Sequence, residues 1–215
     1  MRYTSVLFDL DGTLLDTLGD LTAAMNRTLT RHGLPERTRQ QMRAALGNGA
    51  RRLMELSVPA GTDSALFETL LAEYNADYAA HCRIETAPYP GVAALLLKLH
   101  AQGRKLAIVS NKPDEAVRAL RADFFADAVQ IAVGETAAIR RKPAPDMLLA
   151  AMEQLGADPD KTVFVGDSEV DIATARAADR PCSSVLWGFR DRDVLERAGA
   201  QQFAADASEL ARLLD

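Results

Sequence analysis

The stretch SVLFDLDGTLLDT, residues 5–17, decides the fold and raises the chemical question that the rest of the chain answers. An apolar run at residues 5–8 leads directly into Asp9, and a second carboxylate follows at Asp11. Such a run is typical of a parallel strand that is buried on both faces. Two carboxylates at its end repel each other unless a positive group lies between them.

Short apolar runs recur along the chain, and helical patterns lie between them. The further runs occupy residues 106–109, 128–133, 162–165 and 184–187. Helical spacing of apolar residues occupies residues 92–100 and 146–155, and Gly103 and Gly156 follow as helix stops. Strands that alternate with helices predict an α/β fold, a doubly wound parallel sheet of the Rossmann-like type.

Residues 16–82 interrupt this alternation, because they contain no convincing strand. Apolar residues at helical spacing begin at Leu18, and a second such stripe occupies residues 66–78. These stripes indicate the core of a helical bundle. The prolines and glycine of residues 87–91 predict the hinge by which the chain returns. We therefore expect a helical domain of residues 16–82, inserted into an α/β core formed by residues 1–15 and 83–215.

Composition excludes several classes of partner. The chain has 215 residues and a net charge of −5, so it lacks the basic field that attracts nucleic acid or an anionic membrane. No apolar run approaches the ~20 residues that span a bilayer, and no signal-peptide pattern opens the chain. Cys82 and Cys182 have no metal-type spacing and are expected to be reduced. We expect a cytoplasmic protein, monomeric or homodimeric, with neither a nucleic-acid nor a membrane partner.

Acidic residues return at the end of the fourth apolar run, where VFVGDSEVD places Asp167 and Asp171. The carboxyl ends of parallel strands form the ligand crevice of a doubly wound sheet, so these acids are expected beside Asp9 and Asp11. Two like charges ~4 Å apart cost about 4 kcal/mol at an effective dielectric of ~20. A divalent cation removes this penalty, and ligation by oxygen alone indicates Mg²⁺. A turn or cap would explain one such aspartate, but not both patterns.

Groups that suit a phosphoryl ligand are predicted at the same edge of the sheet. The second apolar run leads into Ser110 and Asn111, and Lys142 follows the third run. A hydroxyl, an ammonium and the backbone N–H groups of a tight loop can together hold the three peripheral oxygens of a phosphoryl group.

Four segments, taken together, resemble the four motifs of the haloacid dehalogenase superfamily, in the same order. They are DLDGTL at residues 9–14, Ser110-Asn111, Lys142-Pro143 and Gly166-Asp167-Ser168-x-x-Asp171. The helical insert resembles the cap domain that this superfamily places after its first strand. Within the superfamily, the chain looks most like the phosphoglycolate phosphatases, through residues 16–21, residues 47–51 and Trp187-Gly188.

The resemblance implies a Mg²⁺-dependent phosphatase that acts on a small phosphorylated metabolite, such as 2-phosphoglycolate, through an aspartyl phosphate. Asp9 would be the nucleophile, and Asp11 would protonate the leaving alkoxide and then activate water. The implied metal ligands are Asp9, Asp167 and the backbone carbonyl of Asp11, with Asp171 supporting the site. The implied phosphate-binding residues are Gly12, Thr13, Ser110, Asn111 and Lys142. The implied substrate-recognition residues of the cap are Asn48, Gly49, Ala50 and Arg51.

Two alternative functions remain open. A phosphomutase similar to β-phosphoglucomutase would return the phosphoryl group to a sugar, although such enzymes tend to have Val where this chain has Thr13. A non-enzymatic phospho-receiver module also uses acids, a hydroxyl and a lysine, but its acid pair is usually adjacent and its chain is about half as long. A nucleotide-binding loop is disfavoured, because Gly47-Asn48-Gly49 does not follow a predicted strand.

Overall fold

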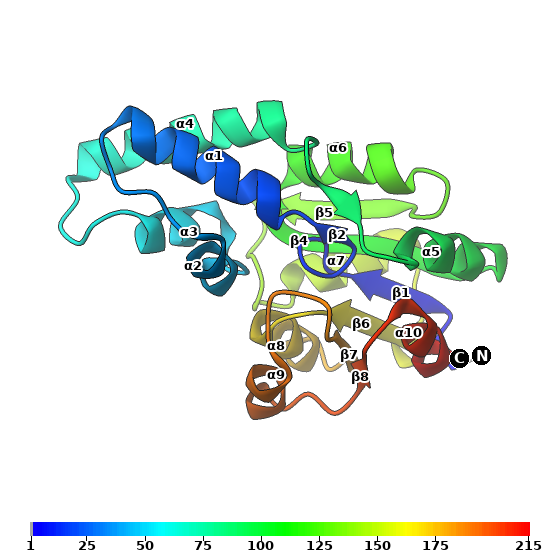
Figure 1. Ribbon diagram of the computed structural model, residues 1–215. Helices are drawn as coiled ribbons and strands as arrows, with labels where there is room; N and C mark the ends of the chain where they lie inside the picture. Colours follow the sequence, from blue (N-terminus) through cyan, green and yellow to red (C-terminus); the bar gives the residue numbers. More distant parts are fainter. Residues whose placement is uncertain (1) are drawn as a thin grey trace. The chain divides into compact units, whose positions relative to one another are not determined.

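A computed structural model describes residues 2–215, and the chain divides into two compact units (Figure 1). An α/β unit contains residues 2–15 and Pro88–Asp215, and a helical unit contains Asp16–Ala87. The return boundary lies after residue 87, whereas the sequence suggested residue 82. The Asp20 carboxylate explains the difference, because it accepts hydrogen bonds of 2.9–3.0 Å from the backbone N–H groups of Ile84, Glu85 and Thr86.

Within the described residues, the α/β unit contains a six-stranded sheet in which neighbouring strands are parallel. Its strands, in spatial order, are β5 (Ile131–Glu135), β4 (Lys105–Pro113), β1 (Ser5–Phe8), β6 (Thr162–Gly166), β7 (Cys182–Val185) and β8 (Phe203–Ala204). From β1 the chain builds first toward β5 and then returns to β6 on the other side. In such a sheet, ligands bind where this reversal occurs, outside the carboxyl ends of the strands. The predicted doubly wound fold is confirmed.

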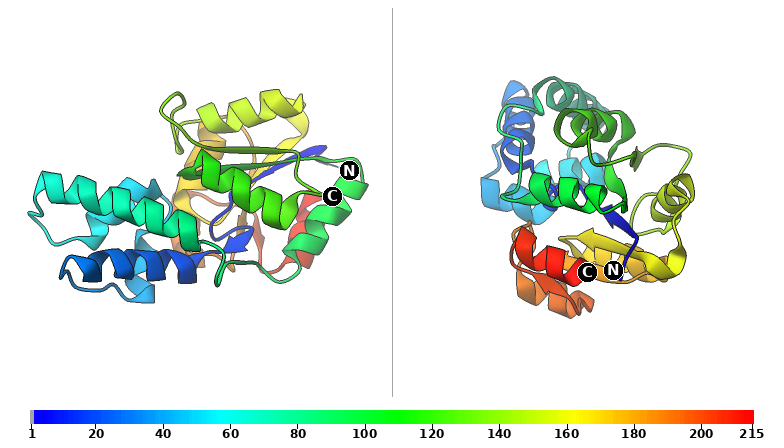
Figure 2. Two further views of the ribbon diagram at one scale, coloured as in Figure 1. Left: turned by 90° about the horizontal axis from the view of Figure 1, so that it is seen from above. Right: turned by 90° about the vertical axis from the view of Figure 1, so that its right-hand side faces the viewer.

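Helices cover both faces of this sheet. They are α5 (Val92–Ala101), α6 (Asp114–Phe125), α7 (Asp146–Leu155), α8 (Glu169–Ala177), α9 (Arg192–Ala198) and α10 (Ala207–Leu214), with a short 3₁₀ turn at Pro159–Lys161. Helices α6 and α7 lie on opposite sides of the sheet (Figure 2). On the α7 side, Leu7, Ala107, Val109 and Phe164 pack with Met147 and Leu148. Both faces of the central strands are therefore buried, which is why their sequences read as continuous apolar runs.

The helical unit consists of α1 (Leu18–Arg31), α2 (Arg39–Ala45), α3 (Gly49–Ser57) and α4 (Ser64–His81). Helices α1 and α4 lie side by side (Figures 1 and 2). Their buried residues include Leu21, Met25 and Leu29 on α1 and Leu70, Leu71 and Tyr74 on α4. The two predicted stripes are thus the facing surfaces of two helices. Where the chain passes between the units, the two-residue strands β2 (Leu15–Asp16) and β3 (Ala87–Pro88) pair with each other.

Three predicted strands differ in their bounds by two residues or more, and the fourth strand is one residue longer than predicted. The third begins at Ile131 rather than residue 128, because the N–H groups of Ala128 and Val129 donate to the Phe125 carbonyl and close the end of α6. The second continues to Pro113, past the predicted end at residue 109, and its pairing with β5 becomes irregular there. The fifth is β7, which ends at Val185, so that residues 186–187 lie in a loop. No helix in residues 2–215 combines the length and the apolar character that a membrane crossing requires.

Candidate active site

The residue that follows β1 is Asp9, and it is buried at the reversal point of the sheet. Its N–H donates to the Val165 carbonyl of β6 over 2.8 Å, so strand pairing extends one residue beyond Phe8. The chain then turns tightly, because the N–H groups of Leu14 and Leu15 both donate to the Leu10 carbonyl at 3.0 Å. Gly12 has φ +88°, a left-handed conformation that favours glycine. This turn places Thr13 beside Asp9.

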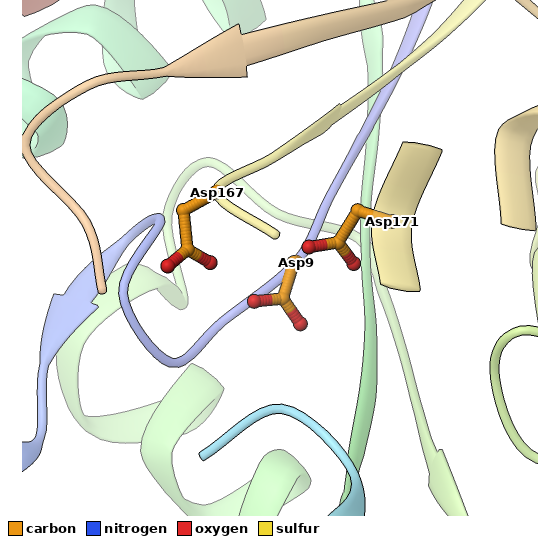
Figure 3. Close-up of side chains that lie close together, drawn as sticks. All are labelled: Asp9, Asp167 and Asp171. Atoms are coloured by element: carbon orange, nitrogen blue, oxygen red, sulfur yellow. The ribbon is translucent and has the colours of Figure 1, made fainter. Parts of the chain in front are cut away.

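Three buried carboxylates meet at this point (Figure 3). Asp9 follows β1, Asp167 follows β6, and Asp171 lies in the first turn of α8; one oxygen of each lies within 4.8 Å of one oxygen of the others. The Thr13 hydroxyl lies 3.2 Å from Asp167 Oδ1 and 3.5 Å from Asp9 Oδ2, so its single proton is shared between two acceptors. The sheet thus brings together acids that are more than 150 residues apart in the chain.

Lys142 provides positive charge inside this cluster. Its Nζ lies 2.6 Å from Asp9 Oδ1 and 2.6 Å from Asp171 Oδ1, and its side chain is 3% exposed. The other oxygen of Asp171 accepts hydrogen bonds from the Ser168 N–H and hydroxyl at 3.1 and 2.6 Å. Burial alone would lower the pKa of Lys142, but the carboxylates of Asp171 and Asp9 raise it above its ordinary value. Lys142 therefore stays charged at neutral pH.

One ammonium does not compensate three buried carboxylates. Burial raises the pKa of Asp9 well above its usual range; Lys142 opposes this rise, and Asp171 and Asp167 add to it. Burial, followed by the charge of Asp171, raises the pKa of Asp167 to about 7, although the Phe189 N–H opposes the rise. The ionised carboxylates of Asp9 and Asp167 therefore still lack a fully compensating positive charge.

The donor set fits a hard divalent cation. Ligands of an octahedral Mg²⁺ at about 2.1 Å lie about 3–4 Å from one another, close to the spacing of the three carboxylates. Both oxygens of Asp171 are held by close donors, Lys142 on one and Ser168 on the other. By contrast, Asp9 Oδ2 and Asp167 Oδ1 share the single proton of the Thr13 hydroxyl, at 3.5 and 3.2 Å. Asp9 and Asp167 are therefore the side chains best able to hold the ion, as the resemblance implies.

The loop after β7 fixes Asp167, a role that the sequence did not suggest. The Phe189 N–H donates to Asp167 Oδ2 over 2.7 Å, and the Trp187 indole N–H donates to the Thr13 carbonyl over 3.0 Å. Gly188 lies so close that an added Cβ would fall 2.5 Å from Asp167 Oδ2 and 2.5 Å from the Gly12 carbonyl oxygen. The Trp187-Gly188 pair was the only sequence feature that pointed to this loop. The donor to Asp167 is the backbone N–H of Phe189, which the identity of the side chain does not reveal.

We expect Gly188→Ala to weaken metal binding, because the new methyl group must displace Asp167 or the Asp9 turn. A shift of this size would lower metal affinity by about 10- to 100-fold, as loss of supporting contacts around metal ligands does. Titration with Mn²⁺, followed by electron paramagnetic resonance, measures the change. Gly103→Ala is the control for a destabilising glycine replacement away from the site: φ +78° strains the new residue, but its Cβ meets no atom within 4 Å, so metal affinity should not change. Unchanged Mn²⁺ affinity in Gly188→Ala would contradict the close approach.

The predicted phosphate-binding residues of β4 lie near Lys142. Ser110 and Asn111 are both buried. The Asn111 amide pairs with the backbone of Lys142, donating to its carbonyl at 3.0 Å and accepting from its N–H at 2.9 Å. Asn111 therefore anchors the Lys142 loop, a contact that the sequence did not suggest. The Ser110 hydroxyl accepts a hydrogen bond from the Lys112 N–H at 3.3 Å.

The predicted recognition residues of the cap lie in the helical unit, whereas the acidic cluster belongs to the α/β unit. Asn48 precedes α3, and Gly49 begins that helix, followed by Ala50 and Arg51. The Arg51 guanidinium forms a two-pronged pair with Glu68 of α4, at 2.8 and 2.9 Å. This partner was not predicted. Exposed pairs of this kind contribute little stability, so the Arg51 guanidinium can exchange Glu68 for another carboxylate at low cost.

Comparisons with known proteins agree with this site. A family model described as haloacid dehalogenase-like hydrolase matches residues 6–185. N-acetylmuramic acid 6-phosphate phosphatase of Pseudomonas aeruginosa is 33% identical over 217 residues, which cover 100% of this chain and 96% of that protein. Phosphoglycolate phosphatase of Xanthomonas campestris pv. campestris is 35% identical over 192 residues, which cover 88% of this chain and 86% of that protein.

The fold is shared with solved structures. A protein of Lactobacillus delbrueckii subsp. bulgaricus, provisionally named phosphoglycolate phosphatase, superposes with a TM-score of 0.94 at 35% identity. The match covers 100% of this chain and 99% of that one. The resemblance suggested by the four motifs is confirmed, since the family model spans all of them. The chain belongs to the haloacid dehalogenase-like hydrolase family.

Proposed function

We propose that this protein is a Mg²⁺-dependent phosphatase that hydrolyses a small alkyl phosphate monoester through an aspartyl phosphate formed on Asp9. The observation that carries the proposal is the convergence of Asp9, Asp167, Asp171 and Lys142 at the reversal point of the sheet. Relatives at 33–35% identity that span most of the chain are phosphatases. A carboxylate nucleophile beside a phosphate dianion needs nearby positive charge, and this site provides Lys142 and two acids suited to a cation.

The residues divide the reaction between them. Asp9 attacks phosphorus and forms the aspartyl phosphate, while Asp11 gives its proton to the departing ester oxygen. Asp11 then takes a proton from the water that attacks the intermediate, and Asp9 leaves as a carboxylate. Ser110 and Lys142 bind the peripheral phosphoryl oxygens. The N–H groups of Gly12 and Thr13, which the sequence suggested as further donors, instead donate to the Leu15 and Leu10 carbonyls at 2.9 and 3.3 Å. Mg²⁺ held by Asp9, Asp167 and the Asp11 carbonyl would supply positive charge that offsets repulsion between the nucleophile and the phosphate.

The substrate class follows from the chemistry that the relatives' names share. Phosphoglycolate and N-acetylmuramic acid 6-phosphate are both primary phosphate monoesters, and both also carry a carboxylate. We propose a substrate of this class, with 2-phosphoglycolate as the first compound to test. Asn48, Gly49, Ala50 and Arg51 of the cap are the proposed recognition residues, and Arg51 has the charge and planar geometry that suit a carboxylate.

The experiment is a panel of phosphate esters with the purified protein. We expect phosphate release to be fastest with a carboxylate-bearing primary ester, and Arg51→Met to raise the KM for that ester more than for an uncharged alkyl phosphate. Arg52→Met is the matched control, because Arg52 pairs with Glu55 on the same helix. Isomerisation of β-glucose 1-phosphate with little free phosphate would instead establish the phosphomutase. Absence of turnover with every ester would contradict an enzymatic role.

Removal of divalent metal should stop turnover. In EDTA we expect phosphate release to fall by at least about 10³-fold, because Asp9 then faces the phosphate dianion without charge compensation. Added Mg²⁺ should restore the rate, and Ca²⁺ should restore it poorly, since Ca²⁺ favours longer bonds and more ligands. A coupled phosphate assay measures both. Full activity in the chelator would end the argument for a metal.

A further inference from the structure

We infer that Lys112 is a positioning residue that holds Asp11 in the orientation needed for proton transfer. The inference rests on the proposed function, because it concerns the acid and base of that reaction. Neither the sequence patterns nor the family motifs quoted above include Lys112. The residue stands two positions beyond Ser110, at the end of β4.

The contact between the two side chains is short and largely buried. Lys112 Nζ lies 2.9 Å from Asp11 Oδ1, and the side chains are 4% and 20% exposed. Burial of an ammonium is costly unless the group is paired, so this geometry is strongly favoured over one that leaves the lysine unpaired. Hydrogen bonds between charged groups are also stronger than neutral ones. The more buried Lys112 therefore restrains the more exposed Asp11.

The backbone that carries Lys112 is itself fixed by the neighbouring strand. Between the pairs Val109–Val133 and Pro113–Glu135, β4 advances four residues while β5 advances two. Bulges of this kind redirect side chains and occur often beside active sites. Gly134 of β5 permits the arrangement, because an added Cβ there would fall 2.8 Å from the Lys112 carbonyl oxygen. The β4 irregularity thus gives Lys112 a defined direction.

The site contains a second buried lysine with different partners. Lys142 contacts Asp9 and Asp171, whereas Lys112 contacts Asp11. Positive charge for the nucleophile and for the proposed phosphoryl site is thus already present at Lys142. The position of Lys112 beside the acid and base, rather than beside the nucleophile, distinguishes its function.

Both chemical steps require the same carboxyl group in one place. In the first, a bond forms between Asp9 and phosphorus, the phosphorus–ester oxygen bond breaks, and the Asp11 proton passes to that oxygen to give the alcohol. In the second, a water oxygen bonds to phosphorus, one water proton passes to Asp11, and Asp9 departs as phosphate is released. With Oδ1 held by Lys112, the proton is transferred through Oδ2 in both steps. Correct orientation of reacting groups contributes strongly to rate.

The test compares two esters that differ in their need for an acid. An alkyl phosphate needs Asp11 to protonate its alkoxide, whereas 4-nitrophenyl phosphate releases a stable anion. In Lys112→Met, we expect the first turnover of the best alkyl ester to slow by about 10- to 100-fold, part of the usual 10²- to 10⁴-fold effect of an acid or base. The first turnover of 4-nitrophenyl phosphate should stay within about threefold of wild type, because its leaving group needs no proton from Asp11.

A second signature comes from the water step, which depends on Asp11 for both esters. Lys112→Met should therefore show a burst of one equivalent of 4-nitrophenolate followed by slow turnover, which stopped-flow absorbance detects. Lys112→Arg should restore both steps in large part. Lys105→Met, the same change at the opposite end of β4, should behave as wild type, because its Nζ contacts the Gly156 carbonyl. First-turnover rates do not depend on the folded fraction of a sample, so partial misfolding leaves the comparison intact.

Three results would overturn the inference. Equal slowing of the first turnover for both esters would assign Lys112 to the phosphoryl group. A raised KM with unchanged kcat would assign it to substrate binding, and wild-type rates in Lys112→Met would give it no part in the reaction. Failure of the proposed function is separate and is seen first, because the wild-type enzyme would then turn over neither ester.

Discussion

Asp9→Asn is expected to abolish turnover, by at least about 10⁴-fold, while the fold persists. An amide is a very poor nucleophile toward phosphorus, and no other carboxylate occupies the same position between Lys142 and Asp167. The rate of phosphate release at saturating Mg²⁺ measures the effect. Asp160→Asn is the matched control, because the Asp160 side chain is 97% exposed and far from the cluster in the fold. Residual activity above about 1% would remove Asp9 as the nucleophile.

Asp9→Asn should also change the thermal stability of the protein. Because burial raises the pKa of Asp9 above its unfolded value, the folded protein binds this proton more tightly, and ionised Asp9 opposes folding as the pH rises above that unfolded value. Asn removes this opposition at neutral pH. In EDTA we therefore expect the unfolding temperature of Asp9→Asn to equal or exceed that of wild type, and added Mg²⁺ to stabilise the variant less. A large loss of stability in EDTA would contradict the crowding of charge at this site.

Lys142→Met should lose both activity and stability. Removal of the ammonium leaves Asp9 and Asp171 as buried carboxylates without their shared partner, and loss of one partner of a buried pair costs about 3–5 kcal/mol. Turnover should fall by about 10²- to 10³-fold, the usual effect of removing one group that stabilises a charged transition state. Urea unfolding and a phosphate assay measure the two effects. Lys161→Met, a change at an exposed lysine, is the control.

A double variant separates the two contributions. Lys142→Met with Asp171→Asn removes one of the uncompensated carboxylates, so it should recover part of the lost stability. Activity should not recover with it, because the proposed phosphoryl site still lacks the Lys142 ammonium. Additive loss of stability in the double variant would show that Lys142 and Asp171 do not interact.

The sequence predicted which acids meet at the edge of the sheet, because each acid lies close in the sequence to the apolar run that forms its strand. Asp9 follows one apolar run directly, and Asp167 follows another after a single glycine, so strand polarity alone brings them to one edge. The helical unit was also predictable, since Leu21 and Leu70 belong to stripes whose period is helical. These features depend on local pattern and on a general rule of sheet topology.

The remaining contacts depend on geometry that the sequence does not encode locally. The role of Lys112 depends on an irregularity in β4. The hydrogen bond from the Gly134 N–H to the Asp114 carboxylate, at the start of α6, could not be inferred from either residue alone. Phe189 acts through its backbone N–H, for which side-chain identity is no guide. Arg51 meets Glu68 on another helix, across a connection whose path was unknown. Asn111 was predicted to bind phosphate, to which its amide can donate hydrogen bonds. In the structure, that amide donates to the Lys142 carbonyl instead.

A crystal structure of the protein grown with Mg²⁺ tests the central claim most directly. The account predicts a single ion bound by carboxylate oxygens of both Asp9 and Asp167 at about 2.1 Å, with Asp171 remaining on Lys142. Absence of the ion at saturating Mg²⁺, or the two carboxylates more than about 8 Å apart, too far to share an ion at that bond length, would contradict it.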